Sequence, residues 1–148
     1  MLFIGSDHAG FELKSQILES LRAQKTKVED CGTDSDQSCD YPVIAQQLTG
    51  QVLKNPGSLG VLICGSGVGM SIAANKVKGI RAACVSEPRS AALCRQHNNA
   101  QILCLGARII SLDTAMECVN AFLKAQFESS HPRHQRRIDQ IAEMEGKS

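Results

Sequence analysis

The sequence predicts an α/β protein in which helices cover both faces of a five-stranded parallel sheet, a three-layer α/β/α arrangement. Short apolar runs alternate along the chain with segments of helical periodicity, which is the pattern of strands joined by helical crossovers. The run LGVLIC at residues 59–64 lacks polar alternation, as expected of a strand buried on both faces. Together the two patterns predict a Rossmann-like sheet.

The first part of the chain supplies two strands and a helix. Residues 2–4 form a short apolar strand, and a polar turn at 5–10 leaves it. The helix that follows, to about residue 23, is predicted by apolar residues at near-helical spacing: Phe11, Leu13, Ile17, Leu18 and Leu21. A second strand is expected around 27–30. The Asp-, Ser- and Gly-rich segment 31–42 is then a loop, long enough to line a site.

Proline and glycine mark the ends of the next predicted helix. Pro42 begins it at the first helical position, and the helix ends at residues 55–57. Its packed face is expected to consist of Ile44, Leu48, Val52 and Leu53. After the central strand, the chain turns through three glycines into a short helix at 70–76.

The second half of the chain continues the alternation. Strands are expected at 80–85 and 102–105, with a helix at 86–96 between them. A further helix at 115–127 is predicted by its inward apolar face: Met116, Val119, Phe122 and Leu123. Pro132 separates it from a more polar C-terminal helix that begins at about residue 133.

Composition and charge describe a single domain, residues 1–148, whose 43% hydrophobic content is enough to bury a core. Sixteen basic residues against fifteen acidic ones leave a net charge of +1, which argues against a nucleic-acid surface and favours a small anion as ligand. Seven cysteines without C-x-x-C spacing indicate a reducing, cytoplasmic location rather than disulfides or a zinc site. No segment predicts a signal peptide or a membrane span.

The central strand ends in Cys64, which is followed by a glycine-rich turn and a helix. Gly65, Gly67 and Gly69 permit close approach of the backbone, and the free N–H groups at the start of the helix form an anion site. A thiol beside those donors should give up its proton more easily than a free cysteine, which makes Cys64 a candidate base. The alternative is that Cys64 is only a small buried apolar residue.

Titratable side chains also follow the first strand and the fourth helix. If the first strand neighbours the strand that ends at Cys64, then Asp7 and His8 share one crevice with the thiol at the carboxyl edge of the sheet. His97, between a helix and a strand, is a further candidate for proton transfer. The alternative for both histidines is a solvated loop side chain.

Three arginines are candidates for gripping a phosphate group. Arg133 and Arg137 are four residues apart on one helix face, and Arg108 follows the fifth strand. The alternative is a solvated basic face. The glycine loop lacks the Lys-Ser/Thr of a Walker sequence, and it carries Met70 where a cysteine-loop phosphatase needs arginine.

Seven segments, taken in order, carry a resemblance that spans nearly the whole chain. They are GSDHAGF at 5–11, DYP at 40–42, ICGSGVGMSIAANK at 63–76, GIRA at 79–82, RQHN at 95–98, GAR at 106–108 and RH at 133–134. Together they closely resemble the type B ribose-5-phosphate isomerases. The related galactose-6-phosphate and allose-6-phosphate isomerases share this scaffold. The resemblance implies conversion of an aldose phosphate to its ketose isomer through an enediolate, without a metal or organic cofactor.

The resemblance also implies roles for individual residues. Cys64 is then the base that carries a proton between C1 and C2, and His97 assists opening of the sugar ring. Ser66 stands where the family usually has threonine, and its hydroxyl can do the same polar work. Asp7 joins them as a catalytic residue that binds the sugar. The residues expected to bind substrate are His8, Tyr41, Gly65, Gly67, Val68, Gly69 and Asn98, and those expected to hold its phosphate are Arg108, Arg133 and Arg137.

The assembly implied by the resemblance is a homodimer or tetramer in which each active site draws on two chains, with no nucleic acid or membrane as partner. Relative to the usual Glu-Gly-Gly-Arg-His of the family, two residues are added between Glu128 and Arg133. The leading hypothesis is a ribose 5-phosphate isomerase. A hexose 6-phosphate isomerase is the alternative enzyme. A sugar-phosphate binding module without chemistry would have to lack Cys64 or His97, and both are present.

Overall fold

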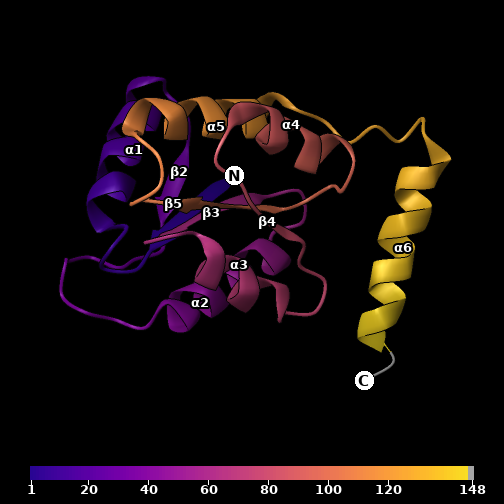
Figure 1. Ribbon diagram of the computed structural model, residues 1–148, viewed down its shortest axis with the longest axis horizontal. Helices are drawn as coiled ribbons and strands as arrows, with labels where there is room; N and C mark the ends of the chain where they lie inside the picture. Colours follow the sequence, from indigo (N-terminus) through magenta and orange to yellow (C-terminus); the bar gives the residue numbers. More distant parts are fainter. Residues whose placement is uncertain (147–148) are drawn as a thin grey trace.

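The computed structural model describes residues 1–146, which form an all-parallel sheet with helices on both faces (Figure 1). The strands are β1 (Leu2–Ser6), β2 (Val28–Asp30), β3 (Leu59–Cys64), β4 (Ala82–Cys84) and β5 (Ile102–Gly106). The helices are α1 (Phe11–Ala23), α2 (Tyr41–Lys54), α3 (Val68–Asn75), α4 (Pro88–Gln96), α5 (Leu112–Lys124) and α6 (Pro132–Gly146). The strand order is β2-β1-β3-β5-β4, so β3 is central and β1 is its neighbour. The predicted fold class is confirmed.

The boundaries of α5 differ from the sequence prediction. The helix begins at Leu112 because Ser111 caps it, its Oγ accepting a hydrogen bond from the Thr114 N–H at 3.2 Å. It ends at Lys124, where Ala125 takes up an extended backbone conformation. The apolar periodicity alone had placed the helix at 115–127, because periodicity reports the packed face and not the cap.

One predicted packing contact in α2 is wrong. Leu53 is 44% exposed, whereas Val52 is buried. Consecutive residues of an α-helix lie about 100° apart around its axis, so the residue next to a buried one turns toward solvent. The expected helix at 70–76 also starts earlier, at Val68, directly after the turn at Gly67.

Consecutive residues of the inner strands pack into two cores, one on each face of the sheet. Ile4 and Val61 pack with the buried residues of α1, α4 and α5, whereas Phe3 and Leu62 pack with those of α2 and α3. All four side chains are at most 3% exposed. Both faces of β3 are therefore buried, so a ligand can reach this strand only at its ends, of which the carboxyl end carries Cys64.

A buried lysine holds the loop after β2 against that end of the sheet. Lys14 on α1 is fully buried, and its Nζ lies 2.7 Å from Asp30 Oδ1 and donates a hydrogen bond to the Thr33 carbonyl. Ser6 N–H also donates to the Gly32 carbonyl, and Thr33 N–H donates to the Ser6 carbonyl, both at 2.7 Å. The loop that the sequence predicted to line a site is thus tied to the end of β1.

The C-terminal helix α6 stands beside the rest of the structure (Figure 1). A cavity of about 690 Å³ lies between it and the segment 75–83, and the Gly79 N–H donates across the gap to Glu145 Oε2 at 2.9 Å. Ile138 is buried, but Ile141 and Met144 are 43% and 74% exposed. Such an apolar stripe is typical of a surface that another molecule covers. No helix within residues 1–146 is both long and apolar enough to cross a membrane.

Two glycines provide a matched test of the packing around the site. Gly10 lies directly on β3, where an added Cβ would meet the Ile63 carbonyl oxygen at 2.7 Å, whereas a Cβ added at Gly50 in α2 meets nothing within 4 Å. We expect Gly10→Ala to lower the free energy of unfolding by about 1–3 kcal/mol through overpacking. Gly50→Ala should raise it by about 0.5–1 kcal/mol. Urea unfolding measures both changes, and equal stabilities of the two variants would contradict this account of the packing.

Candidate active site

Three adjacent strands end at the same edge of the sheet, and the loops that follow them form one pocket. Ser6 of β1 pairs with Ile63 of β3, and Cys64 pairs with Gly106 of β5, so the three loops begin at the same level. The pocket has a volume of about 630 Å³. The predicted site residues that line it are Asp7, His8, Tyr41, Cys64, Gly65, Ser66, Val68, Gly69 and Arg108. The expectation that the carboxylate, the imidazole and the thiol share one crevice is confirmed.

The Cys64 thiol is only 4% exposed, yet it lines this pocket. Its Sγ accepts a hydrogen bond from the Gly67 N–H at 3.2 Å. Gly67 has a φ of 81°, a left-handed conformation that side chains disfavour, and this turn brings its N–H back toward the sulfur. The same turn starts α3, whose first N–H groups have no acceptor within the helix. A thiolate and a bound anion are both stabilised by these donors.

Hydrogen bonds between the loops after β3 and β5 position Arg108. Its N–H donates to the Gly65 carbonyl at 2.9 Å. Its guanidinium lies against the same glycine, where an added Cβ would be 2.9 Å from Nη1. Ser66 Oγ accepts a hydrogen bond from the Val68 N–H at 3.2 Å, which holds the hydroxyl at the start of α3. The pocket therefore combines the cationic Arg108 side chain with backbone donors, an arrangement suited to an anionic ligand.

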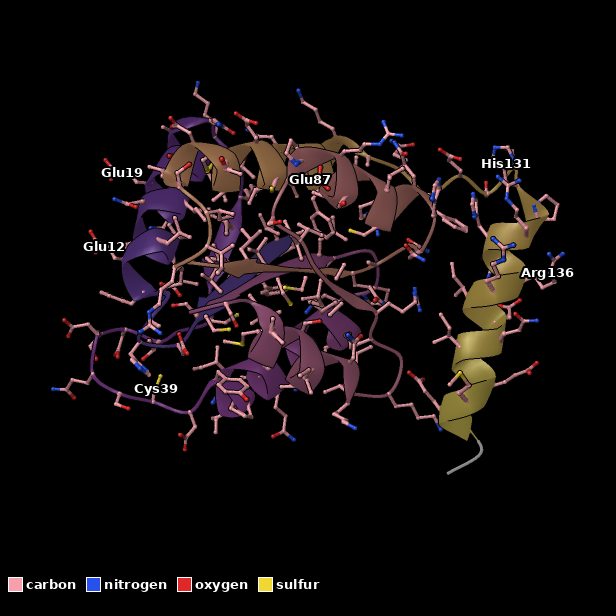
Figure 2. The ribbon with its side chains drawn as sticks, in the orientation of Figure 1. Glu12, Glu19, Cys39, Glu87, His131 and Arg136 are labelled. Carbon is pink, nitrogen blue, oxygen red and sulfur yellow. The ribbon has the colours of Figure 1, made fainter. Side chains whose placement is uncertain are left out.

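Asp7 and His8 form the part of the pocket that follows β1. Asp7 is 5% exposed, and its Oδ1 accepts a hydrogen bond from the Gly10 N–H at 3.1 Å. His8 Nδ1 accepts a hydrogen bond from the Cys39 N–H at 3.2 Å, so the neutral ring carries its proton on Nε2, where it can donate to a ligand. Cys39 lies in the long loop between β2 and α2 (Figure 2). Through this bond the loop helps to build the pocket, as its length predicted, and Tyr41 at the start of α2 lines the pocket beside it.

Of the other predicted residues, Gly67 lies beside Cys64 in the turn before α3, and four residues lie elsewhere on the chain. His97, Asn98 and Arg137 line a smaller cavity of about 190 Å³ between the end of α4 and α6. Arg133, in the first turn of α6, is exposed and is not among the residues that line either cavity. Within one chain, the structure does not bring these four residues to Cys64.

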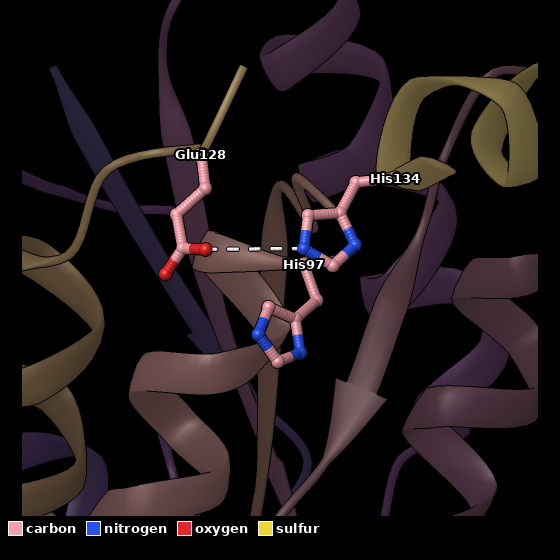
Figure 3. A group of neighbouring side chains, drawn as sticks. All are labelled: His97, Glu128 and His134. Carbon is pink, nitrogen blue, oxygen red and sulfur yellow. Dashed lines mark ion pairs between the residues drawn. The ribbon is translucent and has the colours of Figure 1, made fainter. Parts of the chain in front are cut away.

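His97 belongs to a cluster of side chains that the sequence analysis did not identify. Its ring stacks on that of His134, with centroids 4.5 Å apart and planes at 18°, and Glu128 faces His134 across 3.8 Å (Figure 3). Burial lowers the pKa of His134 from its usual value, and His97 and Arg133 lower it further. The signal present in the sequence was the three-residue spacing of Glu128, His131 and His134.

Cys64 differs from the other thiols in its surroundings. Burial and nearby carboxylates raise the pKa of Cys31 and of Cys118 to about 11, and burial raises that of Cys94 to about 11. Such a thiol is ionised in about one molecule in a thousand at pH 8. Of the seven cysteines, which all lie within the described residues, Cys64 is the one that lines the 630 Å³ pocket.

The fold and this pocket define a class of protein, an α/β enzyme with a thiol, a carboxylate and a backbone anion site at the carboxyl edge of a parallel sheet. A family model described as Ribose/Galactose Isomerase matches residues 2–141. The chain belongs to the ribose/galactose isomerase family.

Individual relatives agree with this membership. The chain is 46% identical over 141 residues to the ribose-5-phosphate isomerase B of Escherichia coli, covering 95% of this chain and 93% of that one. A solved structure of the Clostridium thermocellum ribose-5-phosphate isomerase B matches with a TM-score of 0.94 and 42% identity, covering 99% of this chain and 97% of that one. The Mycoplasma genitalium ribose-5-phosphate isomerase B, solved with bound ribulose 5-phosphate, matches with a TM-score of 0.92 and 46% identity over 99% and 97% of the two chains.

The raised pKa of Cys31 predicts a steep pH dependence for its alkylation. Burial is the main cause and the charge of Glu29 the next, and the pKa is about 11. Below that value the thiolate fraction rises about tenfold per pH unit. The rate of iodoacetamide labelling at Cys31, followed by peptide mass spectrometry, should therefore rise about tenfold from pH 8 to pH 9 and again to pH 10. Glu29→Gln should increase the rate at each pH, and a rate that stays flat would show that the pKa is not raised.

Proposed function

We propose that the chain is an aldose-ketose isomerase that interconverts ribose 5-phosphate and ribulose 5-phosphate. The observation that carries this proposal is the Cys64 thiol, held against the Gly67 N–H in a pocket with Asp7 and Arg108. Relatives named ribose-5-phosphate isomerase B, one of them solved with ribulose 5-phosphate, support the substrate. The seven free cysteines suit the reducing cytosol, where we place the enzyme.

Cys64 acts in this mechanism as the base that moves a proton between C1 and C2 of the open-chain sugar. The enediolate between the two states spreads negative charge over two oxygens, and the N–H groups of the glycine loop and of the start of α3 stabilise it. One such donor is worth roughly 10²–10³ in kcat, and a positioned base about 10²–10⁴. Transfer of a proton between adjacent carbons leaves the electron count of the sugar unchanged, so the step needs no redox cofactor.

The substrate is held by groups around this centre. Asp7 and the Nε2–H of His8 bind sugar oxygens, the Ser66 hydroxyl contacts the reacting end, and Arg108 offers its guanidinium to an anionic group. Remote binding of this kind orients C1 and C2 against the base, which is where much of the rate enhancement of such an enzyme originates.

A second copy of the chain completes the active site in this proposal, in a homodimer or a tetramer. His97 and Asn98 would then open the ring and hold a sugar hydroxyl, and Arg133 and Arg137 would hold the phosphate, in the Cys64 pocket of the neighbouring chain. Three observations support this. His97, Asn98 and Arg137 line a cavity separate from the Cys64 pocket. α6 stands beside the rest of the structure with Ile141 and Met144 exposed. Exposed apolar side chains also surround the Cys64 pocket: Val68, Ile72 and Ile109 are 51%, 58% and 62% exposed.

Complementation between variants tests the shared site. Cys64→Ala and His97→Ala should each lose at least about 90% of the isomerase activity, because each removes a proton-transfer group. A mixed dimer of the two variants, isolated with two different affinity tags, contains one site with both changes and one with neither. Its activity should recover to about half that of the wild type. If the mixed dimer is no more active than the two variants added together, the active site is not shared between chains. If Cys64→Ala keeps full activity, Cys64 is not the base.

A rate comparison among sugars tests the choice of substrate. We expect kcat/KM to be highest for ribose 5-phosphate, with allose 6-phosphate and galactose 6-phosphate at least about tenfold lower, since an extra carbon changes the distance between the reacting carbons and the phosphate clamp. A purified wild-type enzyme assayed on the three sugars under one condition measures this. A preference for either hexose would replace the pentose assignment by the alternative that shares the family scaffold.

A further inference from the structure

Three of the four histidines of the chain gather around one carboxylate where α4 meets the start of α6. His131 Nε2 lies 3.5 Å from Glu128 Oε2, and His134 Nε2 lies 3.8 Å from the same oxygen. Ring nitrogens of His97 and His134 and a carboxylate oxygen of Glu128 all lie within 4.8 Å of one another. Figure 3 shows these three side chains converging, with His97 from the end of α4 and Glu128 and His134 from the segment that leads into α6.

The backbone holds this cluster in place independently of its side chains. The Glu128 N–H donates to the Gln96 carbonyl at 2.9 Å, which ties the segment to the residue before His97. The His131 N–H donates to the Glu128 carbonyl at 3.3 Å, and the His134 N–H donates to the His131 carbonyl at 3.0 Å. The donor atoms are thus brought together by a continuous series of turns, as a binding site requires.

One member of the cluster has an unused polar atom. The side chain of His134 is 6% exposed, and its Nε2 has no hydrogen-bond partner. Buried polar atoms are nearly always paired, so this nitrogen is available to bind a ligand. The nitrogen faces Glu128, whose carboxylate is 37% exposed and accessible from outside.

We propose that His97, Glu128 and His134 bind a divalent transition-metal ion of the Zn²⁺ type and that the bound ion inhibits the enzyme. Two imidazoles and one carboxylate, with water in the fourth position, are an established zinc ligand set. Mg²⁺ and Ca²⁺ prefer oxygen ligands. Bonds of about 2.0–2.1 Å in a tetrahedron place ligand atoms roughly 3.4 Å apart. The donor atoms lie within 4.8 Å of one another, and those of His134 and Glu128 are 3.8 Å apart, so the three groups close by at most about 1.4 Å, chiefly through the partly exposed Glu128.

The ion would inhibit because it coordinates a ring nitrogen of His97. This prediction of inhibition rests on the proposed function. His97 is the group assigned to ring opening, and a coordinated imidazole has no free lone pair with which to exchange a proton. The ion also links the end of α4 to the first turn of α6, so it should stabilise the folded chain by binding it in preference to the unfolded one.

Zinc affinity, measured by competition with a chromophoric chelator, tests the site directly. We expect one high-affinity Zn²⁺ per chain and a loss of at least about tenfold in Glu128→Gln, the size of effect that even outer-shell partners produce. Asp139→Asn, which alters an exposed carboxylate of α6 outside the cluster, should leave the affinity unchanged. Cys64→Ala controls for binding at the catalytic thiol and should also leave it unchanged. Equal affinity of wild type and Glu128→Gln, or a loss confined to Cys64→Ala, would overturn the site.

Two further measurements test separately which residues bind the ion and whether the bound ion inhibits the enzyme. Co²⁺ in place of Zn²⁺ should give a spectrum without thiolate-to-cobalt charge transfer, and a thiolate band would refute the His-Glu set. Zn²⁺ should inhibit wild type and Asp139→Asn reversibly, with at least a tenfold weaker effect on Glu128→Gln. A chain that binds zinc through Glu128 but has no isomerase activity would refute the proposed function and leave the site intact. An active isomerase that zinc inhibits equally in wild type and Glu128→Gln would refute the inhibitory site alone.

Discussion

The Cys64 sulfur is held at the end of β3, and the candidate active site is built around it. β3 is hydrogen-bonded to β1 on one side and β5 on the other, and both of its faces are sealed by packed cores. Cys64 therefore has little freedom to move away from the Gly67 N–H. In the proposed mechanism, donors and a base that are already in place need no reorganisation when charge develops.

The loops around that sulfur are held by contacts that begin far from it. Lys14 is buried in α1, yet its ammonium group reaches Asp30 and the Thr33 carbonyl at the start of the loop after β2, and further along the same loop the Cys39 N–H donates to His8. Arg108 is placed by a hydrogen bond between the loops after β3 and β5. Because each contact joins two elements, the pocket is a property of the sheet edge and not of any one loop.

The chemistry of the chain is divided between two surfaces. One carries the thiol, the carboxylate and the backbone donors, and the other carries His97, Arg137 and the cluster around Glu128. In the proposed mechanism this division makes activity depend on association of chains, since the proposed base and the proposed ring-opening group lie on different surfaces. It also places the proposed metal site where occupancy would act on one proton-transfer group without touching Cys64.

Local patterns in the sequence were enough to predict the strands, the parallel sheet and the crevice shared by Asp7, His8 and Cys64. These features could be predicted because each depends on a short contiguous stretch of sequence: the polar residues that follow a strand, or the absence of polar alternation within β3. The local patterns did not predict that Leu53, next to the buried Val52, faces solvent. They also did not predict the first residue of α5, which is set by the cap at Ser111. The separation of His97 and Arg137 from Cys64, and the approach of Glu128 and His134 to His97, emerged only once the chain was folded. The end of α4 sets the position of His97, and the segment between α5 and α6 brings Glu128 and His134 to it. Contacts between such distant segments leave no mark in the periodicity of either one.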